Sequence, residues 1–344
     1  MPTFSLLQQR PTEYSRQWHK AQLVTPDGDT LAAEIRGRGH STFAQPKHPY
    51  ALRLSSRQSL LTLPANRRYV MLANFFDHSL LRNALALEAA KQTSLADCTP
   101  LYGLFSLNVD GVNQGVYTLT QTVAQTTGAD SLLKLDRYHW DEQRAKSAPL
   151  DTIPANAKID SLSFADYYIL MELCMNAEPC GPRSVYMRLT PEGVLKAGPV
   201  WDFDMAFNTV GIDNGGDLRP ERFRNARQLP PFLQGKTITW LSPDSSLYCA
   251  EAPIFSSLLT DANFRSLVSR RWHELRPKFN ELRHYIRSAA RRIRSVADSD
   301  QQHWNSLDKA RFDPSTTWDT AVSHLQNLYM RRLKALDALL KIHN

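Results

Sequence analysis

The sequence predicts an α+β protein with a β-rich N-terminal part and a mostly helical C-terminal part. The first part reads as short strands and turns around one helix, whereas apolar residues in the second part recur with a helical period. Between the two parts, Asp136–Ile159 is polar and contains two prolines, which is typical of a linker or flexible loop. The expected division is therefore 1–135, 136–160 and 161–344.

Apolar-rich and alternating stretches predict the strands of the first part. They are Leu31–Arg36, Ala51–Leu54 and the apolar run Tyr69–Asn74. Phe105–Val109 and Gly115–Leu119 flank the turn pair Asp110-Gly111, a sequence typical of a β-hairpin. Ser79 is expected to cap a helix through Leu81–Ala89, on which Glu88 is a candidate partner for a phosphate-binding cation.

The second part begins with the apolar segment Phe164–Leu173, which predicts a helix. This helix leads into the polar loop Asn176–Ser184. Val185–Leu189 and Val194–Ala197 then flank a Pro/Gly turn, so a second hairpin is expected. Residues 253–344 are predicted to form three or four helices.

The composition excludes several classes of protein. The chain has 344 residues and 42% hydrophobic content, and it contains no apolar run of about 18 residues, so we expect no membrane span. The N-terminus lacks a signal-peptide core. Its 4 cysteines are widely spread and match neither a zinc pattern nor a disulfide framework. A cytoplasmic location is the default expectation, and export is left open.

The net charge of +7 is concentrated between Arg265 and Arg294, where basic residues far outnumber Glu274 and Glu281. Apolar residues that recur with a helical period lie between these charged residues. We favour an amphipathic helix with a solvated basic face. The alternative is a surface for an anionic partner, either nucleic acid or an acidic protein, but no nucleic-acid motif supports it.

A glycine-interrupted basic loop, Arg36–Phe43, follows the first alternating strand. Glycines let backbone N–H groups approach phosphate, while Ser and Thr hydroxyls and arginines add donors. A plain hairpin turn is the better interpretation of this stretch alone. Lys47 and Arg53 are further candidate cations for a nucleotide phosphate.

Two carboxylates lie in the stretch Gly198–Asp204. If this stretch is extended, Asp202 and Asp204 share one face, and Trp201 and Phe203 anchor the other. Such a pair can seat Mg2+, although a solvated acidic strand fits the stretch equally well. The order polar loop, hairpin and carboxylate is the order in which protein kinases place their catalytic loop and metal-binding aspartate, and it favours the metal site.

Several blocks together resemble the CotH kinase family, the spore coat protein H-like kinases. In order, they are RGRGHSTF at Arg36–Phe43, PKHPY at Pro46–Tyr50, VMLANF at Val70–Phe75, SLLRN at Ser79–Asn83, DGVNQGVY at Asp110–Tyr117 and GPVWDFDMAF at Gly198–Phe207. The resemblance implies an atypical protein-kinase-like two-lobe fold with a β-rich N-terminal lobe and a mostly helical C-terminal lobe. It also implies ATP- and Mg2+-dependent phosphorylation of Ser or Thr in proteins, including autophosphorylation.

By this resemblance, Asp202 is the metal-binding aspartate, assisted by Asp204, and Ser184 takes the position of a second metal ligand. Glu178 stands where the family usually has the aspartate that serves as base. Its carboxylate lies one methylene further out, and a misplacement of about 1 Å can cost roughly a hundredfold in rate. His40 replaces a typical asparagine. The residues expected at the nucleotide are Arg36, Gly37, Arg38, Gly39, His40, Ser41, Thr42, Lys47, Tyr50, Asn74, Arg82 and Asn83.

The leading hypothesis is therefore an atypical protein kinase that uses ATP with Mg2+ or Mn2+ and acts on a protein substrate. The Glu178 and Ser184 departures also fit a nucleotide-binding pseudokinase that serves as a scaffold. A kinase-fold transferase of another group, such as AMP or an amino acid, is a further alternative, because fold does not determine the group transferred. A nucleic-acid binder is the weakest alternative.

Overall fold

The computed structural model describes residues 1–9, 14–135, 157–180, 184–208, 210–213, 218–220, 238–304 and 315–341. The chain divides into two compact units, each assembled from three segments. The barrel unit comprises residues 1–84, 100–125 and 286–323, and the second unit comprises residues 85–99, 126–285 and 324–344. The domain division expected from the sequence, 1–135, 136–160 and 161–344, concerns domains rather than these compact units and stays a prediction.

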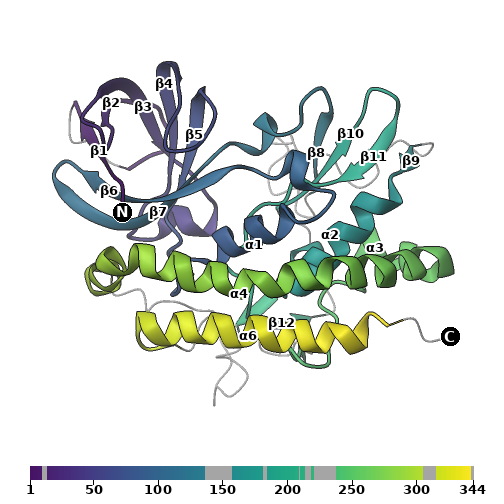
Figure 1. The fold of residues 1–344 in the computed structure, drawn as a ribbon. Helices are drawn as coiled ribbons and strands as arrows, with labels where there is room; N and C mark the ends of the chain where they lie inside the picture. Colours follow the sequence, from purple (N-terminus) through teal and green to yellow (C-terminus); the bar gives the residue numbers. More distant parts are fainter. Residues whose placement is uncertain are drawn as a thin grey trace. The chain divides into compact units, whose positions relative to one another are not determined.

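Seven strands of the barrel unit close into a barrel in the order β1-β2-β3-β4-β5-β7-β6 (Figure 1). Their bounds are β1 Thr3–Gln8, β2 His19–Val24, β3 Thr30–Gly37, β4 Tyr50–Gln58, β5 Asn66–Leu72, β6 Tyr102–Val109 and β7 Val112–Thr120. All neighbouring pairs are antiparallel except β1 and β6, which pair in parallel and complete the barrel.

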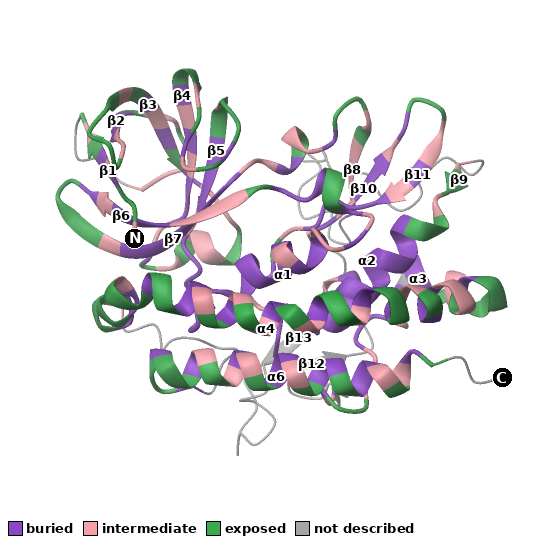
Figure 2. Ribbon diagram, viewed as in Figure 1, coloured by how far each residue is buried: buried purple, intermediate pink, exposed green. Residues whose placement is uncertain are grey.

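Strand alternation fills the barrel with apolar side chains. On β3, Ala33 and Ile35 are buried, whereas Glu34 and Arg36 point outward, as the period of two requires (Figure 2). The interior cluster includes Phe4, Leu6, Ala21, Leu23, Ala33, Ile35, Tyr50, Leu52, Leu54, Tyr69, Met71, Phe105, Leu107, Tyr117 and Leu119. Closure leaves this sheet without an unpaired edge.

The predicted hairpin of the first part is confirmed as β6 and β7. Asp110 and Gly111 have φ angles of 49° and 83°, which is the left-handed pair that a tight hairpin turn requires. The predicted helix is α1, Arg82–Ala90. Asp77 provides the main cap, because its Oδ2 accepts a bond from the Arg82 N–H at 2.7 Å, and Ser79 accepts one from Leu81 at 3.2 Å.

The second unit is built around α2, Ser161–Leu173, which is buried from Ser163 to its end. One sheet has the order β8-β10-β11-β9, with bounds Ser131–Leu135, Val185–Leu189, Val194–Ala197 and Lys158–Ile159. Another contains β12 Val210–Asp213, β13 Leu218–Pro220 and β14 Ile238–Trp240. The expected linker thus ends in strand β9, and its residues 136–156 lie outside the described residues.

Within the described part of residues 253–344, the helices are α3 Pro253–Ser256, α4 Ala262–Trp304 and α6 Trp318–Leu339. In the second unit, α4 and α6 lie side by side (Figure 1). Tyr329 of α6 donates to the Phe279 carbonyl oxygen at 2.7 Å, and Asp337 accepts bonds from Trp272 at 3.1 Å and Arg276 at 2.9 Å. None of the described helices is long and apolar enough to cross a membrane.

The expected α+β class is confirmed, with a β-rich N-terminal and a helical C-terminal region. The sequence did not predict that the N-terminal sheet closes into a barrel. In the barrel unit, the end of α4 contacts β7 at Gln114–Val116. Trp304 donates to the Gln114 carbonyl oxygen at 2.9 Å, and Asp300 accepts from the Val116 N–H at 2.6 Å.

Gly115 allows this approach, and its substitution tests the contact. Gly115 and Gly111 have similar φ angles of 85° and 83°, but only at Gly115 would a Cβ lie 2.1 Å from an Asp300 oxygen. We expect Gly111→Ala to cost about 1 to 2 kcal/mol because of its left-handed backbone. Gly115→Ala should cost roughly 2 kcal/mol more, because the buried Asp300 carboxylate must move away from its donors. Urea unfolding measures both, and equal losses would contradict the assigned role of the contact.

Candidate functional site

The predicted glycine loop is held by the segment that precedes β2. The Gly37 N–H donates to the Ser15 carbonyl oxygen at 2.6 Å. A Cβ at Gly37 would come within 2.8 Å of Phe43, Tyr14 and Ser15, so only glycine fits this close approach. Gly39 has a φ of 87°, a left-handed conformation that also favours glycine.

Tyr14 and Arg16 fix the loop from the same side. The Tyr14 ring stacks on His48 with centroids 3.7 Å apart, and its hydroxyl donates to the Pro49 carbonyl oxygen at 2.7 Å. Burial raises the pKa of Tyr14 to about 12, so this hydroxyl keeps its proton at neutral pH. Arg16 donates to the Gly39 carbonyl oxygen at 2.8 Å. The loop is therefore preorganised, a requirement for binding phosphate through its backbone.

The remaining residues predicted to bind the nucleotide in and after this loop differ in their exposure. Arg36 is exposed on the outer barrel face, where its guanidinium lies 4.9 Å from the Trp18 ring centroid. Arg38 is half-buried, and its N–H donates to Pro49 at 3.2 Å. Tyr50 belongs to the barrel core. His40, Ser41 and Thr42 form the exposed or half-exposed start of the short helix η1, Ser41–Ala44.

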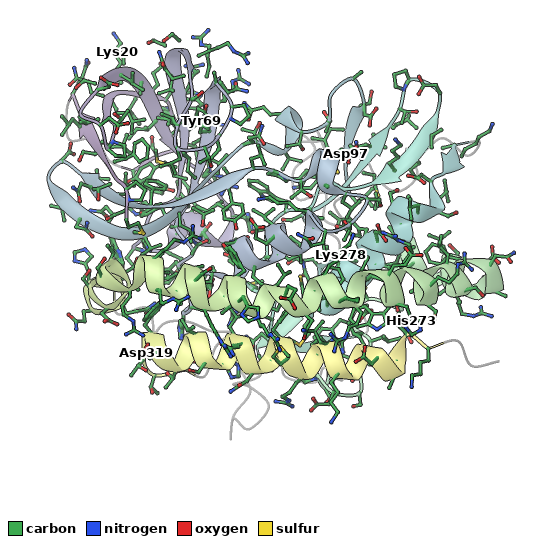
Figure 3. All side chains as sticks on the ribbon, viewed as in Figure 1. Lys20, Tyr69, Asp97, His273, Lys278 and Asp319 are labelled. Carbon is green, nitrogen blue, oxygen red and sulfur yellow. The ribbon has the colours of Figure 1, made fainter. Side chains whose placement is uncertain are left out.

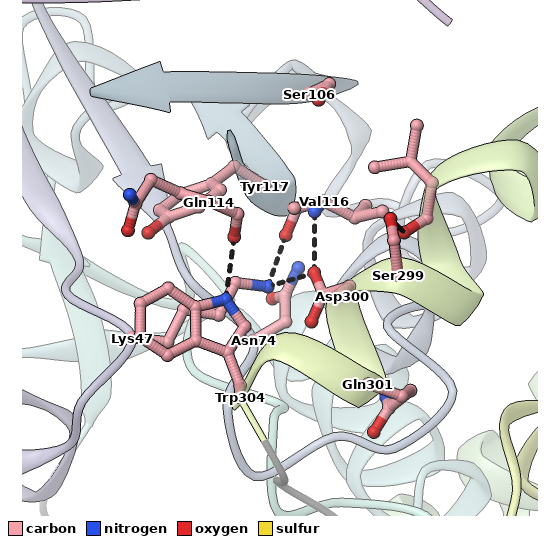
Figure 4. A network of polar contacts seen from close by, with 12 residues as sticks. Lys47, Asn74, Ser106, Gln114, Val116, Tyr117, Ser299, Asp300, Gln301 and Trp304 are labelled. Atoms are coloured by element: carbon pink, nitrogen blue, oxygen red, sulfur yellow. Dashed lines mark hydrogen bonds and ion pairs between the residues drawn. The ribbon is translucent and has the colours of Figure 1, made fainter. Parts of the chain in front are cut away.

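Lys47 is buried in a network that also includes the end of α4 (Figure 4). Its ammonium lies 2.5 Å from Asp300 Oδ2 and donates to the Val116 carbonyl oxygen at 2.8 Å. Burial lowers the pKa of Lys47 and raises that of Asp300, while their mutual attraction opposes both shifts. Protein kinases pair their phosphate-binding lysine with a carboxylate in the same manner.

Sequence reasoning missed Asp300, because it lies 253 residues from Lys47 and nothing in its neighbourhood indicates the pairing. Glu88, the candidate partner on α1, instead forms an ion pair with Lys91 at 2.7 Å.

Three more predicted residues are buried in the barrel unit. Asn74 has a φ of 51° and donates to the Thr118 hydroxyl at 2.9 Å, and Asn83 donates to Asn74 Oδ1 at 3.1 Å. Arg82 lies 3.4 Å from Asp77. The structure thus brings Asn74 and Asn83 together in one buried network that joins β7 to the start of α1.

In the second unit, a helix end positions the predicted catalytic loop. Helix α2 ends in a left-handed residue, Met175, with a φ of 51°. The Met175 N–H bonds to the Glu172 carbonyl oxygen at 3.1 Å, and the Asn176 N–H bonds to that of Met171 at 2.9 Å. This is the Schellman pattern with methionine in place of the usual glycine. It directs the chain into the loop that carries Glu178, which is half-buried at the start of a single helical turn.

The predicted hairpin is confirmed as β10 and β11, which pair with Met187 opposite Ala197. It returns the chain so that Ser184, before the hairpin, meets Asp202, after it. The Ser184 hydroxyl donates to Asp202 Oδ2 at 2.7 Å. Two of the three predicted metal ligands are therefore adjacent, although they lie 18 positions apart.

The stretch around Asp202 is not the extended strand on which we based its geometry. Residues 201–203 are irregular, a turn begins at Asp204, and Asp202 has a φ of 70°. The strand alternation that placed Asp202 and Asp204 on one face therefore does not apply. Phe203 is fully buried, as an anchor should be, whereas Trp201 is half-exposed. The anchored, left-handed backbone leaves the Asp202 side chain exposed beside Ser184.

The Asp202 carboxylate and the Ser184 hydroxyl are oxygen groups of the type that Mg2+ takes as ligands. Among the described residues, no three His, Cys, Asp or Glu side chains gather as a metal-binding group. A magnesium ion, however, is usually held by one or two carboxylates together with substrate phosphates and several waters. The Asp202 carboxylate and the Ser184 hydroxyl fit that partial coordination.

The second unit therefore has the polar loop, hairpin and aspartate of a kinase-like protein, in the order that kinases use. A model of the family described as CotH kinase protein matches residues 35–153 and 152–336, so the chain belongs to the CotH kinase family. The resemblance identified from the sequence motifs is thereby confirmed. The chain matches no curated protein.

Removal of the Lys47 charge should make the stability of the protein depend on the protonation of the buried Asp300 carboxyl. At neutral pH, Lys47→Met should cost about 3 to 5 kcal/mol of stability, because it leaves a buried carboxylate without its cation. In the folded variant, burial raises the pKa of Asp300 above its ordinary value of 3.8. As pH rises above 3.8, the carboxyl therefore loses its proton in the unfolded chain at a lower pH than in the folded chain. Stability due to this group is then present at low pH and is lost as pH rises through the folded pKa.

Urea unfolding of Lys47→Met and of Lys47→Met/Asp300→Asn at several pH values measures this effect. The stability difference between the two variants should grow from about pH 4 to about pH 7, since only the single variant carries the titrating carboxyl. A difference that does not change with pH would show that Asp300 is not the uncompensated charge.

Proposed function

We propose that this protein is an atypical protein kinase that transfers the γ-phosphoryl group of ATP to a Ser or Thr hydroxyl of a protein. The contact between Ser184 and Asp202 at 2.7 Å carries the proposal. It joins the two positions at which kinases hold their metal ions, and the chain belongs to a kinase family.

In this proposal, Asp202 binds Mg2+ or Mn2+ through its exposed carboxylate, with Ser184 as a second oxygen ligand and Asp204 as a neighbouring carboxylate. The bound cation would neutralise charge on the phosphates. The left-handed backbone at Asp202 and the buried Phe203 ring fix the position of the carboxylate before any ligand arrives. Preorganisation of this kind contributes to electrostatic catalysis.

Glu178 is proposed as the base, or as the group that orients the acceptor hydroxyl. The hydroxyl proton passes to its carboxylate while the hydroxyl oxygen bonds to the γ-phosphorus. The bond between that phosphorus and its bridging oxygen breaks, and ADP leaves. The loop at the end of α2 makes Glu178 a reasonable choice, because the Glu178 N–H is fixed by Asn176 Oδ1 at 3.1 Å.

The proposal includes a kinase-like fold, and the barrel unit by itself contains groups of the kind that bind nucleotide phosphates. The preorganised glycine loop offers backbone N–H groups, and Lys47 offers a cation with a paired carboxylate. Asn74, Arg82 and Asn83 would act indirectly, since they are buried in a network that supports the start of α1.

Substitution of Asp202 tests the activity. Purified protein is incubated with γ-labelled ATP and Mg2+ or Mn2+, with autophosphorylation as the readout. Asp202→Ala should reduce labelling by at least about a hundredfold, because the metal-binding carboxylate is lost. Asp27→Ala is the matched control, as it removes an exposed carboxylate in the turn between β2 and β3 and should retain full labelling.

Parallel calorimetry with ATP distinguishes the alternatives. Nucleotide binding without labelling of the wild type would favour a pseudokinase. Mass spectrometry that finds a nucleotide or acyl adduct would instead favour transfer of another group. Absence of both labelling and nucleotide binding would overturn the proposal.

Substitution of Glu178 tests the proposed base. Glu178→Gln keeps the shape and removes the basic carboxylate, so the labelling rate should fall by about a hundredfold or more. Glu178→Asp shortens the side chain to the family's usual residue and should retain or raise the rate. If Glu178→Gln labels as fast as the wild type, another group must accept the proton.

A further inference from the structure

The outer face of β2 to β5 in the barrel unit carries charge of almost one sign. These four strands contain Glu34 as their only carboxylate, against six cations. The cations are Lys20, Arg36, Arg53, Arg57, Arg67 and Arg68. We call this surface the barrel basic face. It is a second basic region of the chain, separate from the one between Arg265 and Arg294.

The register of neighbouring strands places several of these charged residues next to one another. Lys20 lies opposite Glu34, Glu34 opposite Arg53, and Arg53 opposite Arg68, so one row crosses four neighbouring strands. Neighbouring strands are about 4.8 Å apart, which makes the row about 14 Å long. Lys20 is exposed at the outside of the barrel, whereas Tyr69, next to Arg68 in the chain, is buried (Figure 3).

A pocket of about 340 Å³ lies in this row and is lined by Glu34, Arg53, Arg67 and Arg68. Arg53 is fixed in place, because it lies 2.7 Å from Glu34 and 4.6 Å from the Trp18 ring centroid. Arg67 is anchored by a bond from its Nε to the Leu54 carbonyl oxygen at 3.1 Å, which leaves its terminal nitrogens for a ligand. Three arginines and one carboxylate thus give the pocket an excess positive charge.

Three basic residues of α4 differ, because they are already paired with carboxylates. Arg271 bonds to Asp166 at 2.8 Å, Arg276 to Asp337 at 2.9 Å, and Arg294 to Asp319 at 2.5 Å. The amphipathic helix that we favoured from the sequence accounts for these contacts. Within the described residues, by contrast, the Arg68 guanidinium forms no hydrogen bond or ion pair. Arg68 therefore remains available to a partner.

We propose that the barrel basic face docks an acidic segment of a partner protein, with its carboxylates at Arg67 and Arg68. Guanidinium groups bind carboxylates in a bidentate manner, which explains arginine rather than lysine at the pocket. Single-stranded nucleic acid would need open aromatic rings on which bases stack. Trp18 already has two guanidiniums over its ring, and Tyr50 and Tyr69 on these strands are buried. An acidic protein segment needs only the charges.

Fluorescence anisotropy with a labelled oligoglutamate peptide tests the docking on the full chain, without ATP or metal. The Arg67→Glu/Arg68→Glu variant should weaken binding by about tenfold or more, and added salt should weaken wild-type binding. Arg291→Glu/Arg292→Glu on α4 changes the net charge equally at two exposed positions, and it should stay within about threefold of the wild type.

Equal losses in both variants would overturn the proposal, because only net charge would then matter. Oligoglutamate that fails to bind, or a labelled single-stranded DNA that binds more tightly at the same salt concentration, would also overturn it. If the double glutamate variant fails to fold, Arg67→Ala/Arg68→Ala provides the same comparison against Arg291→Ala/Arg292→Ala. Because the assay needs no catalysis, its result is independent of the proposed kinase activity.

Discussion

The barrel unit depends on one buried ion pair, that of Lys47 with Asp300. Moving an ion pair out of water costs several kcal/mol of free energy for each charge. The attraction between the charges offsets this cost only when their hydrogen bonds are also satisfied. The Asp300 carboxylate meets this condition with the Lys47 ammonium and the Val116 N–H. The same constraint explains the glycine at position 115, since any side chain there would occupy the space of the carboxylate. An ionic contact therefore determines which residue the neighbouring strand can carry.

In the second unit, arginines neutralise the buried carboxylates. Glu172 of α2 is fully buried and accepts bonds from the N–H groups of Tyr248 and Cys249 and from Arg332 of α6. Asp166, also on α2, is held by Arg271 and by the Ser94 N–H. Each carboxylate bonds to at least one backbone N–H group and to one cation, so burial leaves no charge uncompensated. Such directional contacts define how helices pack more specifically than apolar area alone.

Local patterns were enough to predict most elements of this fold. Apolar-rich and alternating stretches identified β3, β4 and β5, the Asp-Gly pair identified the β6–β7 hairpin, and a longer apolar run identified α2. The closure of the barrel was not predictable, because it depends on the parallel pairing of β1 with β6, about a hundred residues apart. Contacts of that separation leave no periodic signal in either strand.

The candidate site was predictable to a similar extent. Motif order led to Ser184 and Asp202, which the structure places in contact. The strand geometry assumed for Asp202 was wrong, because a left-handed residue interrupts the alternation and non-glycine residues give no sequence sign of it. Tyr14 and Arg16 were missed as supports of the glycine loop, since they precede every recognisable motif.

The arrangement of the barrel has a consequence for how fragments of this protein should be defined. The match to the family begins at residue 35, inside β3. Strands β1 and β2 lie before that point and form two of the seven strands of the barrel. The segment between them supports the glycine loop. A recombinant fragment cut at the family boundary would expose the apolar interior and open two strand edges to aggregation. The folding unit therefore extends further toward the N-terminus than the sequence motifs that identify it.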